Sequence, residues 1–217
     1  MEKVIAIVGS DGKMGTLVSN TLNKKYKVEK ITLKNKLQDY KKIDFVIDFA
    51  CAKSSVESAK FCQTKNIPIL IASTGQNERQ LKTLYEISKN IPMMICSNLS
   101  IGVAQVKKII NSIDFSRNYD ISIIEKHHTE KKDIPSGTAI MLKKFLNEKT
   151  KENIEIISER GGKEIGTHTI DFYFDDELIS ITHKAFSRNC FALGALKATD
   201  FMIKQTKPGL YYFDDLI

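Results

Sequence analysis

One stretch of the sequence, residues 125–139, combines residue types that could protonate a substrate and hold an anion. It contains two adjacent histidines, His127 and His128, which are half of the four histidines in the chain. Imidazole is a suitable proton donor near neutral pH, because its reference pKa is about 6.5. Lys131 follows His127 by four residues, so both side chains would share one face if the segment is helical. These residues predict acid–base chemistry on an acidic substrate.

The end of the same stretch predicts the start of a helix that could bind an anion. Ser136 is a favourable N-cap residue, and Gly137 and Thr138 would open the helix. The first backbone N–H groups of a helix lack partners within it, so they can hold a carboxylate. A single histidine would more often be an ordinary surface or core residue. The whole cluster favours a functional site, in which His127 and Lys131 are the candidate catalytic residues.

Three glycines at every third position follow the first apolar run of the chain, residues 4–8. They are Gly9, Gly12 and Gly15, and an amphipathic helical pattern accompanies them. Backbone without Cβ atoms can turn sharply and approach a pyrophosphate, and a helix start then offers N–H groups to the anion. The spacing GxxGxxG differs from the usual GxGxxG, and a plain tight turn is the alternative. The position between a strand and a helix favours a dinucleotide site.

The residue expected to read the ribose of such a cofactor is not the usual acid. An acidic side chain normally follows the second strand of the unit, but this sequence has Lys34, Asn35 and Lys36 there. Asn35 could hydrogen-bond a ribose, and the lysines could face a 2′-phosphate. The segment therefore predicts that NADH and NADPH are both accepted. A solvated basic loop is an equal alternative.

The elements that would position these residues change character after residue 98. Short apolar strands at 4–8, 28–33, 45–47, 68–71 and 92–95 alternate with helices. One of these helices would be capped by Ser54 or Ser55, and another would start near Glu78. This alternation predicts a parallel sheet that is covered on both faces. A helix follows from about Ile101, with an apolar stripe that includes Ile109. A strand at 119–124, a helix near Ser136, an antiparallel hairpin at 168–174 and 178–185, and a last helix from about Asn189 complete the chain.

Composition excludes several classes of protein. The net charge is +7, but acidic residues are interspersed and only 8% of residues are aromatic, which argues against nucleic-acid binding. No segment approaches the roughly 20 apolar residues that span a membrane, and the N-terminus does not resemble a signal peptide. The four cysteines form no CxxC pair, so we expect reduced thiols, a cytoplasmic protein and no metal site.

Several collinear motifs resemble the dihydrodipicolinate reductase family. HHTEKKDIPSGTA is similar to the family's HHxxKxDxPSGTA, GSDGKMG to GxxGxMG, IASTG to the GTTG loop and SNLSIG to (S/A)NxSxGV. The family pattern RGGxxxGxHT is matched by the stretches RGG and GTHT. The pattern ITHxAxxR is matched by ITHKA followed by Ser187 and Arg188. The resemblance extends along nearly the whole chain.

The resemblance implies an α/β protein with two domains. One is a Rossmann-like, parallel-sheet nucleotide-binding domain of residues 1–99 and 190–217. The other is a mixed-sheet α/β domain of residues 100–189 for substrate binding and oligomerisation, typically into a homotetramer. The implied reaction is reduction of 4-hydroxy-tetrahydrodipicolinate with NADH or NADPH in lysine and diaminopimelate synthesis.

The resemblance also assigns roles to residues of this sequence. His127 would donate a proton and Lys131 would stabilise charge. The substrate dicarboxylate would be bound by His128, Ser136, Gly137 and Thr138. The cofactor would be bound by residues of three loops and the residue after the second strand: Gly9, Ser10, Asp11, Gly12, Lys13, Met14, Lys34, Ala72, Ser73, Thr74, Cys96, Ser97, Asn98 and Leu99.

The sequence departs from the family pattern in a few places, and two other functions fit parts of it. The chain is short, with a trimmed region between Leu33 and Asp44. Ala72 and Ser73 replace a glycine and a threonine, and Ile134 replaces an alanine. A dehydrogenase of another small acid would need the glycine turn without the His-His-Lys cluster. A non-catalytic nucleotide sensor would keep the turn while its catalytic residues decayed.

Overall fold

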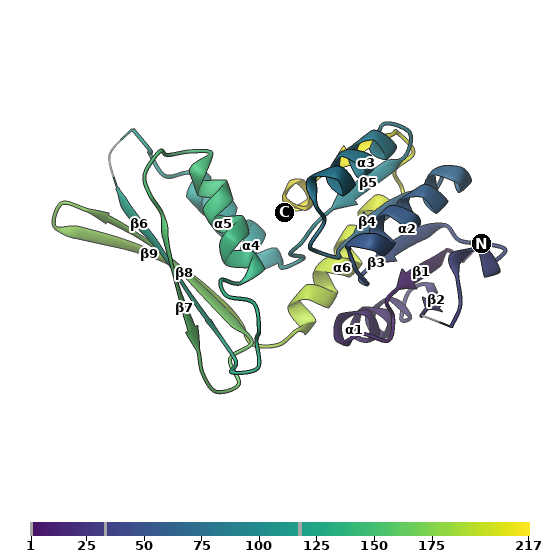
Figure 1. Cartoon of the computed structure of the whole chain (residues 1–217), viewed down its shortest axis with the longest axis horizontal. Helices are drawn as coiled ribbons and strands as arrows, with labels where there is room; N and C mark the ends of the chain where they lie inside the picture. Colours follow the sequence, from purple (N-terminus) through teal and green to yellow (C-terminus); the bar gives the residue numbers. More distant parts are fainter. Residues whose placement is uncertain (1, 33, 117–118) are drawn as a thin grey trace. The chain divides into compact units, whose positions relative to one another are not determined.

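The computed structural model describes residues 2–32, 34–116 and 119–217, which fold into two compact units (Figure 1). The first unit comprises Met1–Ser100 and Asn189–Ile217, and the second comprises Ile101–Arg188. Each boundary lies one residue from the division expected from the sequence. The chain leaves the first unit after residue 100 and returns to it with its last helix.

The first unit is built on a six-stranded sheet in which every pair is parallel. Its order is β10-β5-β4-β3-β1-β2. The strands are β1 (Val4–Val8), β2 (Lys27–Ile31), β3 (Phe45–Asp48), β4 (Ile69–Ile71), β5 (Pro92–Ile95) and β10 (Gly209–Tyr211). Strands β1, β3 and β4 are buried along nearly their whole length, because a parallel sheet is covered on both faces. The predicted Rossmann-like sheet is confirmed.

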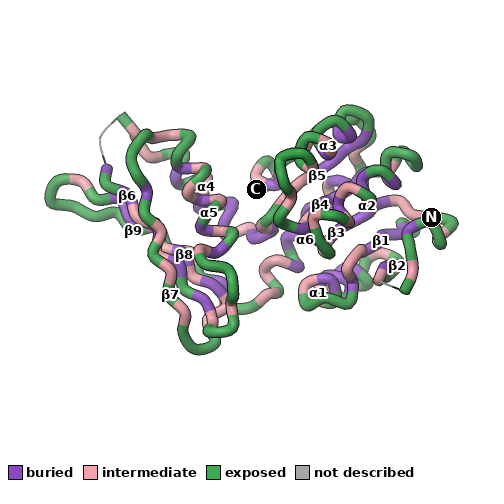
Figure 2. The backbone as a smooth tube through the Cα atoms, in the orientation of Figure 1, coloured by how far each residue is buried: buried purple, intermediate pink, exposed green. Residues whose placement is uncertain are grey.

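Helices cover this sheet. They are α1 (Lys13–Leu22), α2 (Ala52–Lys65), α3 (Glu78–Ser88) and α6 (Asn189–Met202), with short 3-10 helices η1 (Leu37–Asp39) and η2 (Phe213–Leu216). Helix α1 packs against α6, and α2 packs against α3. The buried residues gather on the sheet, as the purple segments of Figure 2 show for β1, β3 and β4.

Two expected boundaries in this unit were wrong. Helix α2 begins at Ala52 with Cys51 as its N-cap, not at Ser54 or Ser55. The reason is that the Ser54 hydroxyl donates to the Asp48 carboxylate at 2.9 Å and accepts from the Cys51 N–H at 3.1 Å. Strand β2 ends at Ile31 rather than running to Leu33, which lies outside the described residues. The chain leaves the strand there because Asn35 accepts a hydrogen bond from the Thr32 N–H at 2.7 Å.

The second unit has a four-stranded mixed sheet with the order β7-β6-β8-β9. The strands are β6 (Asp120–His127), β7 (Glu155–Arg160), β8 (Gly166–Phe174) and β9 (Glu177–Ala185). Only the β6–β7 pair is parallel. The expected hairpin is confirmed, although its turn needs only Asp175 and Asp176, the first of which has a φ of 44°.

Helices α4 (Ile101–Asn111) and α5 (Gly137–Asn147) complete the second unit and share a core with the sheet. The buried residues of α4 include Val103, Val106 and Ile110. Ile109 was expected on this stripe, but its side chain is 49% exposed because it lies one position away from the buried spacing. In the sheet, Ile121 and Ile123 of β6 pack into the core, so alternate residues of β6 face it.

Candidate active site

His127 is the last residue of β6, and its side chain lies on the buried side of that strand. The burial of β6 alternates, so residues 121, 123, 125 and 127 are all buried on one face. The segment of His127 and Lys131 is not helical, so the condition for a shared helix face is not met: β6 continues to His127, and Lys131 follows the turn after it. That turn is closed by the Lys131 N–H, which donates to the His128 carbonyl at 3.1 Å.

Glu125, two residues earlier on the same face, is fully buried and accepts hydrogen bonds from three neighbouring segments. The Arg160 guanidinium of β7 donates to both carboxylate oxygens, at 2.7 and 2.9 Å. The Ser136 N–H donates to Oε1 at 3.1 Å, and His127 Nδ1 hydrogen-bonds Oε2. Burial by itself raises the pKa of Glu125, but the hydrogen bonds from Arg160 and His127 outweigh it and lower that pKa to about 2. The group is a permanent carboxylate at physiological pH.

Opposing effects act on the pKa of the His127 imidazole. Burial lowers its pKa, and the nearby cations Lys131 and Arg160 lower it further. The hydrogen bond and charge of Glu125 act in the opposite direction and raise it. The net shift is downward from the ordinary value, so the ring can lose its proton readily near neutral pH.

A second histidine, His168 of β8, packs against the first. The ring centroids of His127 and His168 are 5.2 Å apart in an edge-on arrangement. His168 is 4% exposed, and its Nε2 hydrogen-bonds the Ser136 hydroxyl at 3.0 Å. Its Nδ1 has no hydrogen-bond partner among the described residues. Burial, together with the nearby His127 and His183, lowers the pKa of His168 to about 3, so it is neutral.

Ser136 ties these groups to helix α5. Its hydroxyl accepts from the Ala139 N–H at 3.2 Å, which confirms it as the N-cap. Because its own N–H donates to Glu125 and its hydroxyl also contacts His168, Ser136 links the helix to the buried groups. Its predicted substrate contact stays a prediction. Gly137 and Thr138 form the first turn of α5, as expected for an anion-binding helix start.

Lys131 is 21% exposed, and its Nζ lies 2.7 and 2.8 Å from the two carboxylate oxygens of Asp133. The backbone N–H of Gly137 also favours the charged form of this carboxylate. Burial of Asp133 raises its pKa, but Lys131 and the backbone N–H groups outweigh that effect and lower it. The half-buried His128 is tied down through its backbone, because its N–H donates to the Glu164 carbonyl at 2.7 Å.

The glycine turn of the first unit has the expected strand–turn–helix setting. Gly9 has a φ of 77°, and a Cβ atom there would lie 2.9 Å from the Ala50 backbone. A Cβ on Gly15 would lie 2.1 Å from the Gly9 carbonyl oxygen, so α1 could not pack against the turn. Helix α1 begins at Lys13, and no side chain caps its N-terminus at Gly12. These features fit a cradle for the phosphates of a dinucleotide.

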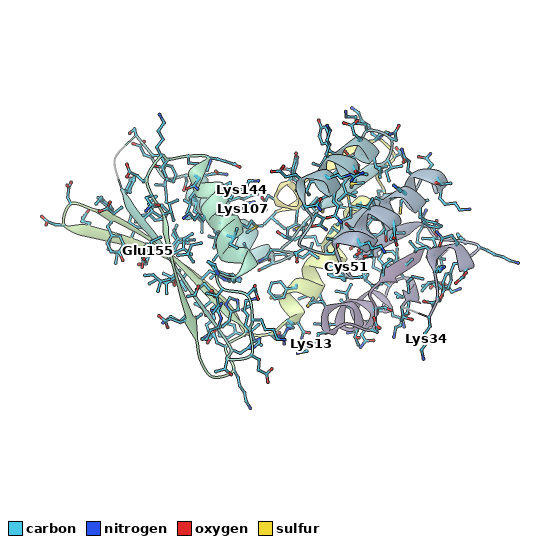
Figure 3. All side chains as sticks on the ribbon, in the orientation of Figure 1. Lys13, Lys34, Cys51, Lys107, Lys144 and Glu155 are labelled. Atoms are coloured by element: carbon cyan, nitrogen blue, oxygen red, sulfur yellow. The ribbon has the colours of Figure 1, made fainter. Side chains whose placement is uncertain are left out.

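A cavity of about 550 Å³ opens beside this turn, within the first unit. Asp11 and Gly9 line it with the loop after β2 and the start of α2, where Figure 3 labels Cys51. Lys36 is among its lining residues. Lys34 is exposed and is not among them. The cavity has the size of a small-molecule site and therefore fits part of a nucleotide.

Asn35 lines the cavity, but its amide is already used within the loop. Its Nδ2 donates to the Lys30 carbonyl at 2.9 Å and to the Tyr40 hydroxyl at 2.8 Å. Its Oδ1 accepts from the Thr32 N–H at 2.7 Å. The loop-stabilising role therefore explains Asn35 better than ribose binding does.

The other predicted cofactor residues gather at the carboxyl ends of β1, β4 and β5. The N–H groups of Ala72 and Ser73 both donate to the Asp48 carbonyl at 2.9 Å, and Thr74 beyond them is exposed. After β5, the Cys96 N–H donates to the Ile71 carbonyl at 2.9 Å. Ligands of open parallel sheets bind at this edge. Further residues of this set are placed as follows: Asp11, Gly12, Lys13 and Ser97 are exposed, Met14 and Asn98 are half-buried, and Ser10 and Leu99 are buried.

Two comparisons of sequence identify the family. The family model described as the C-terminus of dihydrodipicolinate reductase matches residues 102–217, and the N-terminus model matches residues 27–99. The 4-hydroxy-tetrahydrodipicolinate reductase of Clostridium perfringens is 34% identical over 251 aligned positions, which cover 100% of this chain and 98% of the relative. The enzyme of that name from Wigglesworthia glossinidia brevipalpis is 42% identical over 81% of this chain and 68% of the relative.

The chain belongs to the dihydrodipicolinate reductase family. A solved structure described as dipicolinate-bound dihydrodipicolinate reductase from Paenisporosarcina sp. TG-14 has the same fold, with a TM-score of 0.80, 22% identity and 100% coverage of both chains. Family membership accounts for the signature at residues 127–139, which the structure places between the end of β6 and α5.

Sequence reasoning missed three residues of this candidate site. Glu125 could have been found from strand alternation, because it shares a face with His127 once the segment is read as a strand. Arg160 and His168 belong to the family motifs, but the sequence analysis assigned them no role. The structure brings both to Glu125 or His127 through the pairing of β6 with β7 and β8.

Among the residues of this chain that the structure describes, no helix is long and apolar enough to cross a bilayer. The same residues contain no group of three or more His, Cys, Asp or Glu side chains arranged to hold a metal ion.

Proposed function

We propose that this chain reduces 4-hydroxy-tetrahydrodipicolinate to tetrahydrodipicolinate with NADH or NADPH, as a step of lysine and diaminopimelate biosynthesis. The observation that carries the proposal is the His127 site. A buried carboxylate orients a histidine next to a lysine and a helix start, in a chain that belongs to the reductase family. Fold alone would not select the reaction, because related folds host many activities.

The reaction consumes one hydride and one proton and releases one molecule of water. The reduced nicotinamide supplies the hydride. The glycine turn and the N-terminus of α1 would hold the phosphates, since Gly9 and Gly15 leave room for close backbone approach. The loops after β4 and β5 would hold the rest of the dinucleotide.

Within the second unit, each candidate side chain has a distinct task. His127 would donate the proton, because its Nδ1 is engaged by Glu125 and its other ring nitrogen is left to meet the substrate. Lys131 would stabilise negative charge as it develops. The N–H groups of Gly137 and Thr138 would bind a substrate carboxylate, with His128 beside them. These roles rest on the chemistry of the side chains and on the family motif.

We infer further that the protein acts in the cytoplasm as a homotetramer. The sheet face of the second unit that points away from α4 and α5 exposes apolar side chains: Ile157, Tyr173 and Leu178 are 42%, 43% and 52% exposed. Such a face is typically covered in an oligomer. The number four follows the family resemblance. Light scattering at micromolar concentration tests it, and a monomer would contradict it.

The activity is tested by adding enzymatically generated 4-hydroxy-tetrahydrodipicolinate to the purified chain with NADH or NADPH. The expected result is cofactor oxidation that depends on both the chain and the substrate. Oxidation with another small acid but not with this substrate would support a different dehydrogenase. Binding of the nucleotide with no substrate-dependent oxidation would support a non-catalytic sensor.

A further inference from the structure

Glu125 is an unusual carboxylate, because it is fully buried and all its donors come from groups around His127. Two donors belong to Arg160, one is the Ser136 N–H and one is His127 Nδ1. Removing a charged group from water is costly unless it is paired and fully hydrogen-bonded. The bidentate guanidinium and the backbone N–H meet that requirement without the histidine. Glu125 can therefore stay ionised whether or not His127 carries a proton.

The contact with Glu125 decides which nitrogen of His127 reacts. A permanent carboxylate accepts hydrogen bonds and cannot donate one. Nδ1 therefore carries a hydrogen in both protonation states of the ring, and Nε2 is the nitrogen that gains and loses the proton. This is the same logic by which a buried aspartate sets the tautomer of the catalytic histidine in serine proteases.

Gly166 of β8 lies beside the other side of the ring. A Cβ atom on Gly166 would lie 3.0 Å from His127 Nε2 and 3.3 Å from the neighbouring ring carbon. The ring is thus held by Glu125 at Nδ1 and by the edge-on ring of His168, and the absence of a Cβ atom on Gly166 leaves space beside Nε2.

We propose that Glu125 is a positioning residue for His127: it fixes the ring with Nδ1–H toward the carboxylate and Nε2 toward the substrate, and Arg160 holds Glu125 in place. This inference rests on the proposed function, because it assigns a task to a residue that would act through His127. After Nε2 gives its proton to the substrate, the neutral ring keeps Nδ1–H, and a solvent proton restores Nε2–H before the next cycle.

The charges that surround His127 come from every neighbouring segment. Glu125 from β6 and Glu164 from the connection before β8 favour the protonated ring. Arg160 from β7 and Lys131 from the turn disfavour it, and the buried His168 from β8 beside the ring is neutral. Of the two acids, only Glu125 hydrogen-bonds the ring. Its removal should therefore lower the pKa of His127.

The test compares Glu125→Gln with Glu125→Asp and Asp171→Asn. Asp171 is a matched control, because it is a 6% exposed carboxylate of the same sheet that accepts from Ser180 at 2.6 Å but lies on the opposite face from His127. For Glu125→Gln we expect kcat to fall roughly 10- to 100-fold, the range found when partners that orient metal-binding histidines are removed. KM and NADH affinity should change little.

The pH profile separates positioning from simple stabilisation. His127 acts in its protonated form, so a lower pKa should move the alkaline limb of the kcat profile to lower pH in Glu125→Gln. Glu125→Asp should restore part of the rate and of the profile, and Asp171→Asn should leave the profile unchanged. An active Glu125→Gln enzyme with the wild-type profile would overturn the proposal.

A measurement on the wild-type chain covers the case in which Glu125→Gln does not fold. Nitrogen-15 NMR of histidine-labelled protein above the pKa of His127 should find the hydrogen on Nδ1. A hydrogen on Nε2 would refute the proposal, whether or not the enzyme is active. If the proposed function itself is wrong, the wild-type chain will not oxidise NADH or NADPH when the substrate is added.

Discussion

The Nζ atom of Lys131 lies 2.7 Å from one carboxylate oxygen of Asp133 and 2.8 Å from the other. The backbone N–H of Gly137 adds to the stabilisation of the same charge. Asp133 therefore engages the cation that the proposed mechanism assigns to the substrate. A substrate carboxylate would have to compete with this internal one.

Asp133→Asn should lower KM for the substrate, because a neutral amide competes less well for Lys131. Asp133 is 56% exposed, and exposed ion pairs contribute about 0.2–1 kcal/mol, so the expected decrease is roughly 1.4- to 5-fold. The effect should shrink as salt is added. Steady-state kinetics at two ionic strengths measure it. A rise in KM would mean that Asp133 helps to position Lys131 for binding.

Lys36→Ala should weaken NADPH binding and leave NADH binding nearly unchanged, since a 2′-phosphate is the only added charge. Lys36 lines the cavity beside the glycine turn. Lys34→Ala is the matched control, because Lys34, which Figure 3 labels, belongs to the same loop but is not among the lining residues. The ratio of the KM for NADPH to the KM for NADH, measured for each variant, tests this prediction. An unchanged ratio in Lys36→Ala would place this lysine outside the cofactor site.

Gly166→Ala should reduce kcat through the position of His127. The added methyl group would approach Nε2 to 3.0 Å, so the ring or the strand must shift by a few tenths of an ångström. The Kd for NADH, measured by fluorescence titration, should stay unchanged because the glycine turn is in the other unit. Gly161→Ala is a suitable control, since a Cβ there meets no atom within 4 Å. Equal kcat in the two variants would contradict the confined geometry of the ring.

The buried His168 predicts how stability depends on pH. Its pKa is lowered to about 3, so the unfolded chain binds more protons than the folded one between about pH 6.5 and 3. Stability should therefore fall as the pH drops through that window, with a slope from this residue of at most about 1.4 kcal/mol per pH unit.

Urea unfolding at a series of pH values tests this expectation. His168→Gln cannot titrate, so its free energy of unfolding should vary less steeply between pH 6.5 and 3 than that of the wild type. The variant should be less stable at pH 7, because it loses the ring that packs against His127. Parallel curves for the two proteins would show that His168 is not held neutral by the fold.

Five strands of the parallel sheet were readable from the sequence, because continuous apolar runs bounded by glycine or polar turns have one reasonable interpretation, whereas the short edge strand β10 was not predicted. Strand β7 was missed. Only alternate residues of its sequence EIISER are half-buried, and acidic or basic residues stand at both ends, so its pairing with β6 decides its structure. The mixed character of the second sheet depends on this long-range pairing.

The candidate site was predicted only in part for a related reason. His127, Lys131 and the start of α5 are close in sequence, so their spacing drew attention to them. Arg160 contacts Glu125 across 35 positions of sequence, and Ser136 contacts His168 across 32. The condition for His127 and Lys131 to be helical neighbours is not met, because the alternation of β6 extends to the end of the strand.

The central claim is that His127 protonates the substrate in a reductase reaction. The most direct measurement is kcat for substrate-dependent oxidation of NADH by wild-type chain and by His127→Gln, with circular dichroism and NADH affinity recorded for both. Loss of one general acid typically costs about 10²- to 10⁴-fold in rate. The account predicts a decrease in that range with an unchanged fold, unchanged NADH affinity and little change in KM. A folded His127→Gln protein that binds NADH normally and keeps near-wild-type kcat would contradict it.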